Sequence, residues 1–502
     1  MTVNPGDDPS LKRADVVNMQ TRAHVCNALS GGTLGMRAEG KRYLPQEPAE
    51  TPKAYSIRLA KTVLFPAFKK AISTMVGKPF GKPLSLGNDV PAPIKGYCQN
   101  IDLAARDLDT FARDVFQQTM TDGIGWILID YQNTRKIAEE RGKDKLSLEE
   151  ERALGVRPYW IHIPLEKVLG WRSDIVDGRH QLTQFRFEET VEEPFGDFGF
   201  STVRRIRVWE IGNVRVYLWD AKNKAWNLDT ANSGPVTLQE IPIVTCYTGR
   251  TGYLAAEPPL EDLAWLNVEH WQSRSDQRHI LHFARVPILF GKDLTTDPNT
   301  GKVVLGGDRL MTGGPNSDLK VVEHTGAAIE AGRMDLQDIE AAMQRVAGEL
   351  LKSEVQKTAT ESDREAGEGE SQLRKWLKTF QQNLMEALRI TGLWIGEASG
   401  GSLTLAMDWD EAEISADLMV ALTNAVNAGV MSRDTAIWNF KRKGMLPPDR
   451  TVQNELAKIE HEAAPPGGGL GNGVGLSAMD RLKGRSAALA QANGKDPAEG
   501  AA

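Results

Sequence analysis

Residues 335–351 read DLQDIEAAMQRVAGELL, and this stretch decides how the rest of the chain is interpreted. Its apolar residues recur at steps of three and four, and they are Leu336, Ile339, Met343, Val346 and Leu350. That spacing predicts a helix with one narrow apolar seam. Such a seam needs a partner helix, either from this chain or from another copy of it.

Two further long helices are expected on either side of this one, over residues 259–283 and 371–395. Each would run on the order of 35–40 Å, because an α-helix rises 1.5 Å per residue. Between the helix at 259–283 and the helix at 335–351, short strands are expected at 287–290, 302–305 and 320–323. Turn clusters separate them at 297–301 and 313–316. Helices of this length are unusual in a compact enzyme domain and indicate an elongated assembly.

The N-terminal half predicts a mixed domain of helices followed by strands. Apolar residues at helical spacing predict three helices, at residues 14–29, 52–76 and 108–120. A buried strand is expected at 126–129, and alternating residues predict further strands at 184–187, 205–209 and 214–219. Gly212-Asn213 predicts a hairpin turn, which makes the last two strands an antiparallel pair. Residues 136–152 are expected to form a charge-dense helical insertion.

The C-terminal part predicts a strand, three short helices and a flexible tail. The strand is expected at 402–409, and the helices at 417–427, 432–441 and 450–462. From residue 463 onward the chain is rich in Pro, Gly and Ala, a composition typical of a flexible tail. The fold class that follows is α+β.

Composition excludes several classes of function. The 502-residue chain is long enough for several domains, and its net charge of −7 argues against a tight grip on nucleic-acid phosphates. Three widely separated cysteines without a CxxC pair argue against a disulfide framework or a thiolate zinc site. No run of 18 apolar residues occurs, and the N-terminus is polar, so neither a membrane span nor a signal peptide is expected.

No motif predicts a catalytic centre. GxxxxGK(S/T) and GxSxG are both absent, which removes the commonest nucleotide-binding and hydrolase signatures. His279 and His282, with His270 nearby, raise a metal site, but HExxH is absent and a helix C-terminus favours such side chains without a metal. The acidic group at 408–413 has no second carboxylate cluster beside it. We therefore expect no metal, no cofactor and no enzymatic activity.

One part of the chain resembles a known family. The run Pro258-Pro259-Leu260-Glu261-Asp262-Leu263-Ala264-Trp265-Leu266-Asn267-Val268-Glu269-His270-Trp271-Gln272, followed by Ser275-Asp276-Gln277 and Leu281-His282, resembles tailed-bacteriophage portal proteins. It looks closest to a branch often catalogued as a phage domain of unknown function. Further matching pieces occur in the same order along the chain, at 43–45, 55–59, 76–80, 125–131 and 326–343. Together the pieces span roughly residues 40–410.

The resemblance implies a portal-like architecture of wing, stem, clip and crown. The wing would be residues 1–257, to which the strand at 398–410 returns. The stem helices would be 258–285 and 333–355, with the clip between them at 286–332. The remaining parts would be a tunnel loop at 356–370, a spine helix at 371–397, crown helices at 411–462 and a tail at 463–502. Nothing in the resemblance assigns a role to the 136–152 insertion or to the tail.

The same resemblance implies a function and partners. Portal proteins form a ring, usually of about twelve copies, at one capsid vertex, and double-stranded DNA passes through the ring during packaging and ejection. The partners implied are the major capsid protein, the terminase large subunit and a head–tail connector, with no membrane. The location implied is the portal vertex of the virion, reached by assembly in the host cytoplasm.

Three groups of residues become candidate sites under this resemblance. The helix seam at 336, 339, 343, 346 and 350 would pack subunits together. The clip would dock terminase and connector through Lys292, Asp293, Lys302, Asp308 and Arg309. The tunnel loop would meet DNA through Lys352, Lys357 and Arg364, only weakly, because carboxylates surround these cations. The alternatives are another ring-forming head–tail connector, which is usually much shorter, and a DNA-processing enzyme, for which no site is found.

Overall fold

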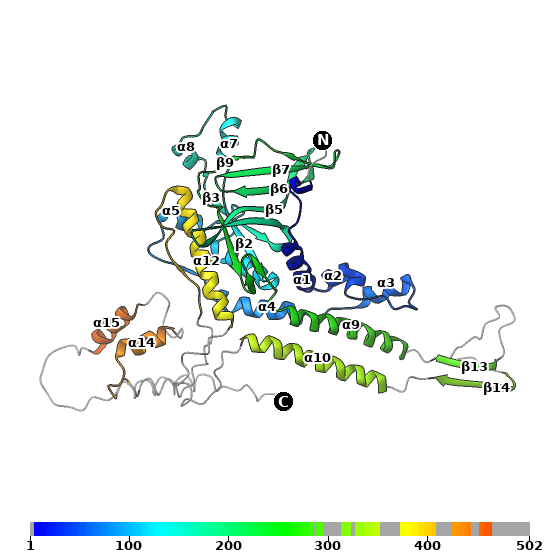
Figure 1. Cartoon of the computed structure of the whole chain (residues 1–502). Coiled ribbons are helices and arrows are strands. Elements are labelled where there is room, and N and C mark those ends of the chain that lie inside the picture. Colours follow the sequence, from blue (N-terminus) through cyan, green and yellow to red (C-terminus); the bar gives the residue numbers. More distant parts are fainter. Residues whose placement is uncertain are drawn as a thin grey trace, which may run out of the picture. The chain divides into compact units, whose positions relative to one another are not determined.

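The computed structural model describes residues 5–284, 288–294, 313–322, 327–351, 372–407, 424, 426, 428–442 and 451–463. The chain divides into two compact units, Met1–Trp409 and Asp410–Ala502. The first unit mixes helices and strands, as the expected α+β class requires (Figure 1).

The N-terminal helices of the first unit are α1 (Ala14–Ser30), α2 (Gly32–Glu39), α3 (Pro52–Lys61), α4 (Ala67–Gly77), α5 (Ala92–Tyr97) and α6 (Leu108–Asp122). Short 3₁₀ turns lie at η1 (Pro5–Asp7), η2 (Gly40–Arg42), η3 (Pro79–Gly81) and η4 (Leu165–Lys167). The helix expected over 52–76 is wrong as a single element, because the chain leaves the helix at Thr62 (ψ 133°). Pro66 lies at the start of α4, where its missing N–H and its effect on the preceding residue break a helix.

A three-stranded antiparallel sheet lies at the centre of the first unit. Its strands are β10 (Ile243–Tyr247), β2 (Ile124–Tyr131) and β3 (Pro158–Pro164), in that order. The strand expected at 126–129 is confirmed as the middle strand, and it is buried on both faces. Ile127 and Ile129 face a large core formed with α4, α6, α9 and α12, whereas Trp126 and Leu128 face a second core.

The second core lies against a six-stranded antiparallel sheet. Its strands are β4 (Val168–Val176), β5 (Arg179–Phe195), β6 (Gly199–Glu210), β7 (Asn213–Asp220) and β8 (Ala225–Leu228), with β9 (Gly234–Pro235) paired to β7. The predicted pairing of β6 with β7 is confirmed, and Gly212 takes φ +72° in the turn between them. The insertion folds into α7 (Thr134–Glu140) and α8 (Leu148–Ala153).

The central segment alternates long helices with one hairpin. It consists of α9 (Glu261–Ala284), β13 (Ile288–Leu294), β14 (Gly313–Val322), α10 (Ala327–Leu351) and α12 (Gln372–Ile395). The helix expected from residue 333 begins earlier, at Ala327. The turn expected at 313–316 belongs instead to β14, where Gly314 lies so close to Asp293 that an added Cβ would come within 2.4 Å of its carboxylate. Figure 1 shows α9 and α10 lying side by side.

Short strand pairs complete the first unit. β11 (Arg250–Gly252) pairs with β12 (Ala255–Ala256), and β1 (Ser85–Leu86) pairs with β15 (Leu403–Thr404). The strand expected over 402–409 is therefore shorter, because β1 offers it only two residues. The second unit contains α14 (Arg433–Arg442) and α15 (Val452–Ala463), which match two of the three predicted helices; the third, at 417–427, lies mostly outside the described residues.

Candidate functional site: the α9–α10 helix pair and its anchor

Three polar contacts show that α9 and α10 run antiparallel. His270 Nε2 lies 3.0 Å from Glu340 Oε1, and Ser273 Oγ donates to Asp335 Oδ2 at 2.7 Å. Further along α9, Gln277 Nε2 donates to the carbonyl of Ile329 at 2.7 Å. The α9 positions rise while the α10 positions fall, so the two helices form a hairpin of their own.

The apolar seam of α10 packs inside this chain. Ile339 is 7% exposed and Met343 is 1% exposed, and both belong to the large core, with Val346 packed against it. Leu336 is half-buried, and the side chain of Leu350 lies outside the description. The partner of the buried residues is thus α9, α4 and α12 of the same chain. A role of this seam in subunit packing stays a prediction.

A single amide joins α9 to the break between α3 and α4. The Asn267 side chain is fully buried, and its Oδ1 accepts a hydrogen bond from the Phe68 N–H at 3.0 Å. Its Nδ2 donates to the Phe65 carbonyl at 2.9 Å. Backbone groups freed at a helix break are costly to bury without partners, and Asn267 provides both partners at once.

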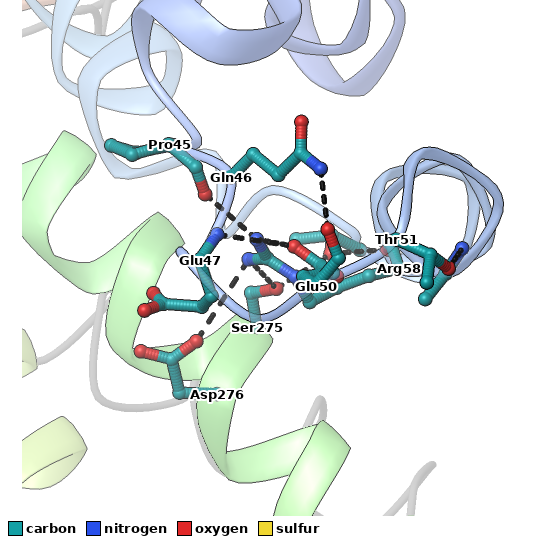
Figure 2. Close-up of polar contacts among 10 residues, drawn as sticks. Pro45, Gln46, Glu47, Glu50, Thr51, Arg58, Ser275 and Asp276 are labelled. Atoms are coloured by element: carbon teal, nitrogen blue, oxygen red, sulfur yellow. Dashed lines mark hydrogen bonds and ion pairs between the residues drawn. The ribbon is translucent and has the colours of Figure 1, made fainter.

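Arg58 of α3 fixes the 45–50 loop against α9 (Figure 2). Its guanidinium holds both oxygens of Glu50, at 2.9 Å from Nε and 2.8 Å from Nη2, and it also donates to the Pro45 carbonyl at 2.7 Å. On the α9 side it lies 3.4 Å from Ser275 Oγ and 3.9 Å from Asp276 Oδ1. A planar donor of this kind suits a buried two-point ion pair.

The ionisation of this cluster follows from its contacts. The hydrogen bond from Arg58 lowers the pKa of Glu50 and in return raises the pKa of Arg58. Burial raises the pKa of Asp276, which Arg58 opposes only in part. Between the helices, burial lowers the pKa of His270, although Glu340 pulls it the other way. The cluster therefore holds the 45–50 loop and α10 against α9 through ion pairs and hydrogen bonds.

The hairpin β13–β14 follows α9 and precedes α10 with only a few residues on either side. Ile288 pairs with Val322, so the open end of the hairpin is the end that connects to the two helices. Of the five predicted clip residues, Lys292 and Asp293 are described, and both are exposed on β13. Asp293 takes φ +52° at a register shift between Lys292 and Leu294.

The other predicted contact residues lie outside the described residues. These are Lys302, Asp308 and Arg309 of the clip and Lys352, Lys357 and Arg364 of the tunnel loop. The clip set as a whole and the tunnel-loop set therefore stay predictions.

Helix α12 is held to the central sheet by hydrogen bonds from two indole groups. Trp394 Nε1 donates to the Ile129 carbonyl at 2.9 Å, and Trp160 Nε1 donates to Thr391 Oγ1 at 2.8 Å. Burial of Phe380 and Leu384 in the large core adds the apolar part of this contact. The α9–α10 pair, α12 and the three-stranded sheet thus share one core.

A cavity of about 640 Å³ lies beside β2, β6 and the insertion, and a buried ion-pair cluster forms part of its wall. Arg207 forms ion pairs with Asp130 and with Glu189, and the Tyr159 hydroxyl donates to Asp130 Oδ2 at 3.0 Å. Burial alone would lower the pKa of Arg207, but the two carboxylates outweigh it and raise the pKa. This arrangement joins the two sheets.

Two features that bear on ligands and membranes are absent from the described ranges. Among those residues, no three or more His, Cys, Asp or Glu side chains come together in a way that would hold a metal ion. Across the same part of the chain, no helix is both long and apolar enough to cross a membrane.

Sequence reasoning missed the residues that fasten the helix pair. Arg58, Asn267 and the partnership of His270 with Glu340 were not predicted, although His270 was weighed as a metal ligand. The available signal was polar side chains, Asn267 and His270, among the apolar residues of a long helix. Such side chains need partners when they are buried.

The family description that matches the chain is a domain of unknown function (DUF4055), over residues 259–395. This range runs from the start of α9 to the end of α12. No curated protein matches the chain.

Solved structures of gene transfer agent (GTA) particles are similar to the chain at 11% sequence identity. The virion of a native GTA particle matches with a TM-score of 0.37, over 82% of this chain and 98% of that chain. The neck of a native particle, computed with C12 symmetry, matches with a TM-score of 0.38, over 74% of this chain and 88% of that chain. The neck of an empty particle, computed with C6 symmetry, matches with a TM-score of 0.40, over 76% of this chain and 90% of that chain. All three TM-scores are too low for a shared fold to follow.

Proposed function

We propose that the chain is a portal protein of a tailed phage, which forms a ring at one capsid vertex and conducts double-stranded DNA. The observation that carries this proposal is the helix–hairpin–helix unit of α9, β13–β14 and α10. Helix α9 is fixed to the α+β body near its start through Asn267 and past its middle through Arg58, and the chain enters the hairpin shortly after the end of α9. This is the order of stem and clip, with α12 in the place of the spine.

Exposed apolar side chains on the helix pair support packing between copies. Trp265 of α9 is 51% exposed and Met334 of α10 is 55% exposed, although both helices are otherwise anchored in the core. In a ring, one face of a subunit meets a different face of its neighbour, and the contacts close when the rotation per subunit divides a full turn. These side chains are available for such a contact.

The charge of the chain suits a conduit. About twelve copies would together carry about twelve times the net charge of −7. Each lasting contact of Lys or Arg with a phosphate adds affinity and friction, so a net negative ring favours sliding over adhesion.

The partners follow from the same proposal. The clip hairpin would dock the terminase large subunit during packaging and a connector afterwards, and the major capsid protein would surround the ring. Energy for translocation would come from terminase, since this chain carries no nucleotide-binding loop. Assembly would take place in the host cytoplasm before the ring becomes part of the virion.

Capture of the terminase large subunit of the same phage by the purified ring tests the docking surface. Charge reversal at Lys292→Glu together with Asp293→Lys should lower capture at least about tenfold, with the ring intact. Lys136→Glu, an equally exposed change on the insertion, is the matched control and should leave capture unchanged. Equal capture by all three proteins, or ATP hydrolysis by the highly purified wild-type chain, would contradict the proposal.

A further inference from the structure

The tip of the β5–β6 hairpin exposes three phenylalanine side chains. Phe195, Phe198 and Phe200 are 72%, 97% and 70% exposed. Pro194 pairs with Phe200 and Phe195 pairs with Gly199, so Phe195 and Phe200 lie on opposite faces of the ribbon, with Phe198 at the turn. Scattered exposed apolar residues are ordinary, but three aromatic rings at one tip mark an interaction site.

The hairpin tip is also acidic. Residues 191–203 contain Glu192, Glu193 and Asp197 and no basic residue. Further down the hairpin the carboxylates are already neutralised, since Glu188 pairs with Arg204 and Glu189 with Arg205. Both glutamates near the tip are exposed. A partner surface should therefore be apolar with a basic rim.

The same chain exposes such a surface on α2, α3 and the segment after α3. Leu34, Ile57 and Val63 are 76%, 46% and 37% exposed. Arg37 donates to the Thr62 carbonyl at 2.9 Å, and the Leu64 N–H donates to Thr33 Oγ1 at 3.2 Å, which brings α2 against residues 62–64.

Two exposed lysines complete the basic apolar patch, defined here as Leu34, Ile57, Val63, Lys53 and Lys61. Lys53 and Lys61 lie four residues before and after Ile57, on the same face of α3. On α3 the patch thus places the apolar side chain of Ile57 between two cations, which complements the apolar and acidic hairpin tip.

We infer that the hairpin tip of one copy docks on the basic apolar patch of the next copy. Both surfaces are exposed in a single chain, so neither satisfies the other internally. Two different complementary surfaces on one chain make a heterologous contact, which is the kind that closes into a ring. The inference deepens the proposed function, on whose ring it rests, by naming the contact between neighbours.

The size of the tip defines its part in that contact. Because Phe195 and Phe200 lie on opposite faces, one docked face buries Phe198 and one of these two rings, up to roughly 300–500 Å², whereas a stable interface needs about 800 Å² on each partner. The tip is therefore one contact within a larger interface, and its loss alone should weaken the ring without abolishing it.

Disulfide trapping tests the contact directly. A chain carrying both Phe198→Cys and Ile57→Cys should give a ladder of covalently linked subunits after mild oxidation, and the ladder should collapse on reduction. The native Cys26, Cys98 and Cys246 are buried, so they do not compete. In the matched control, Ile175→Cys replaces Phe198→Cys; Ile175 is 70% exposed on a different hairpin, and its ladder should be at least about tenfold weaker.

Charge reversal tests the complementarity in the same trapped pair. Glu192→Lys with Glu193→Lys should lower the cross-linking rate at least about fivefold, and so should Lys53→Glu with Lys61→Glu. All four changes together should restore the rate to within about twofold. An absence of restoration would overturn the electrostatic part of the inference.

Mass photometry separates failure of the contact from failure of the proposed function. Wild-type rings without a ladder in the double-cysteine chain would overturn the docking of tip on patch. Wild-type protein that forms no ring under any salt condition would overturn the proposed function itself.

Discussion

Replacing Arg58 by methionine should loosen the 45–62 segment from α9. Arg58 and Glu50 side chains are 7% and 9% exposed, so the change leaves a carboxylate buried without its partner. Removing one member of a buried ion pair costs about 3–5 kcal/mol, and the Pro45 carbonyl loses its donor as well. That cost corresponds to opening of the segment about 10²–10⁴ times more often.

Two companion variants distinguish the ion pair from simple packing. Arg58→Met with Glu50→Gln removes both charges. This double variant should destabilise the closed 45–62 segment clearly less than Arg58→Met alone, because no unpaired charge remains. Arg58→Lys should fall between wild type and Arg58→Met, since one ammonium cannot span both Glu50 oxygens and the Pro45 carbonyl.

Amide hydrogen exchange followed by mass spectrometry measures this opening. Peptides from 45–62 should exchange faster in Arg58→Met, whereas peptides from β5 and β6 should not change and act as the internal control. If residues 45–62 of Arg58→Met exchange within about threefold of the wild-type rate, the Arg58–Glu50 ion pair does not hold this segment against α9.

The same assay has a defined pH dependence. The pKa of Glu50 in the folded chain lies below its ordinary value of 4.5, so the stabilisation is complete above that value and is lost as the pH falls toward the folded pKa. Wild-type exchange in 45–62, corrected for intrinsic rates, should rise on acidification below about pH 4.5. Arg58→Met with Glu50→Gln should lack this component.

Three other outcomes are expected. Ile339→Asp and Val346→Asp should each lower the thermal midpoint through a cost of several kcal/mol for unpaired charge in the core. Gln337→Asp, at an exposed position of the same helix, should change the stability by no more than about 0.5 kcal/mol. Burial lowers the pKa of His162 from 6.5 to about 4, and the nearby Arg106 charge adds to this effect. Because the unfolded chain therefore binds a proton at higher pH than the folded chain does, up to about 3 kcal/mol of stability is lost as the pH falls from 6.5 to 4. In His162→Leu, denaturation measured across this pH range should lack that loss of stability. The same pH dependence of the unfolding free energy in wild type and His162→Leu would contradict the assignment to His162. Deleting residues 360–367 should leave rings intact but shorten the packaged DNA, and normal packaging would exclude a DNA contact by the loop.

The long elements were predictable because their periodicity is strong. Helices over α1, α6, α9 and α12 and the strands β2, β6 and β7 follow from apolar spacing alone. The break at residues 62–66 was not predicted, since the apolar spacing of 52–76 continues across Pro66. Only the tertiary partner, Asn267 on α9, shows how the backbone groups at that break are satisfied.

The anchoring cluster could not be predicted from spacing in the sequence. Arg58 and Ser275 are far apart along the chain, and so are His270 and Glu340, and nothing local identifies such pairs. The seam of α10 shows the opposite case. The spacing of its apolar residues correctly predicted a partner helix. It could not show whether that helix belongs to the same chain or to another copy. The burial of Ile339 and Met343 beside α9 shows an intrachain partner for these two residues.

Electron microscopy of the purified chain tests whether it forms the proposed ring. We predict closed rings of about twelve subunits around a central channel, with α9 and α10 of every copy arranged about that channel. Particles that remain monomers, or closed two-fold dimers without a channel, would contradict it.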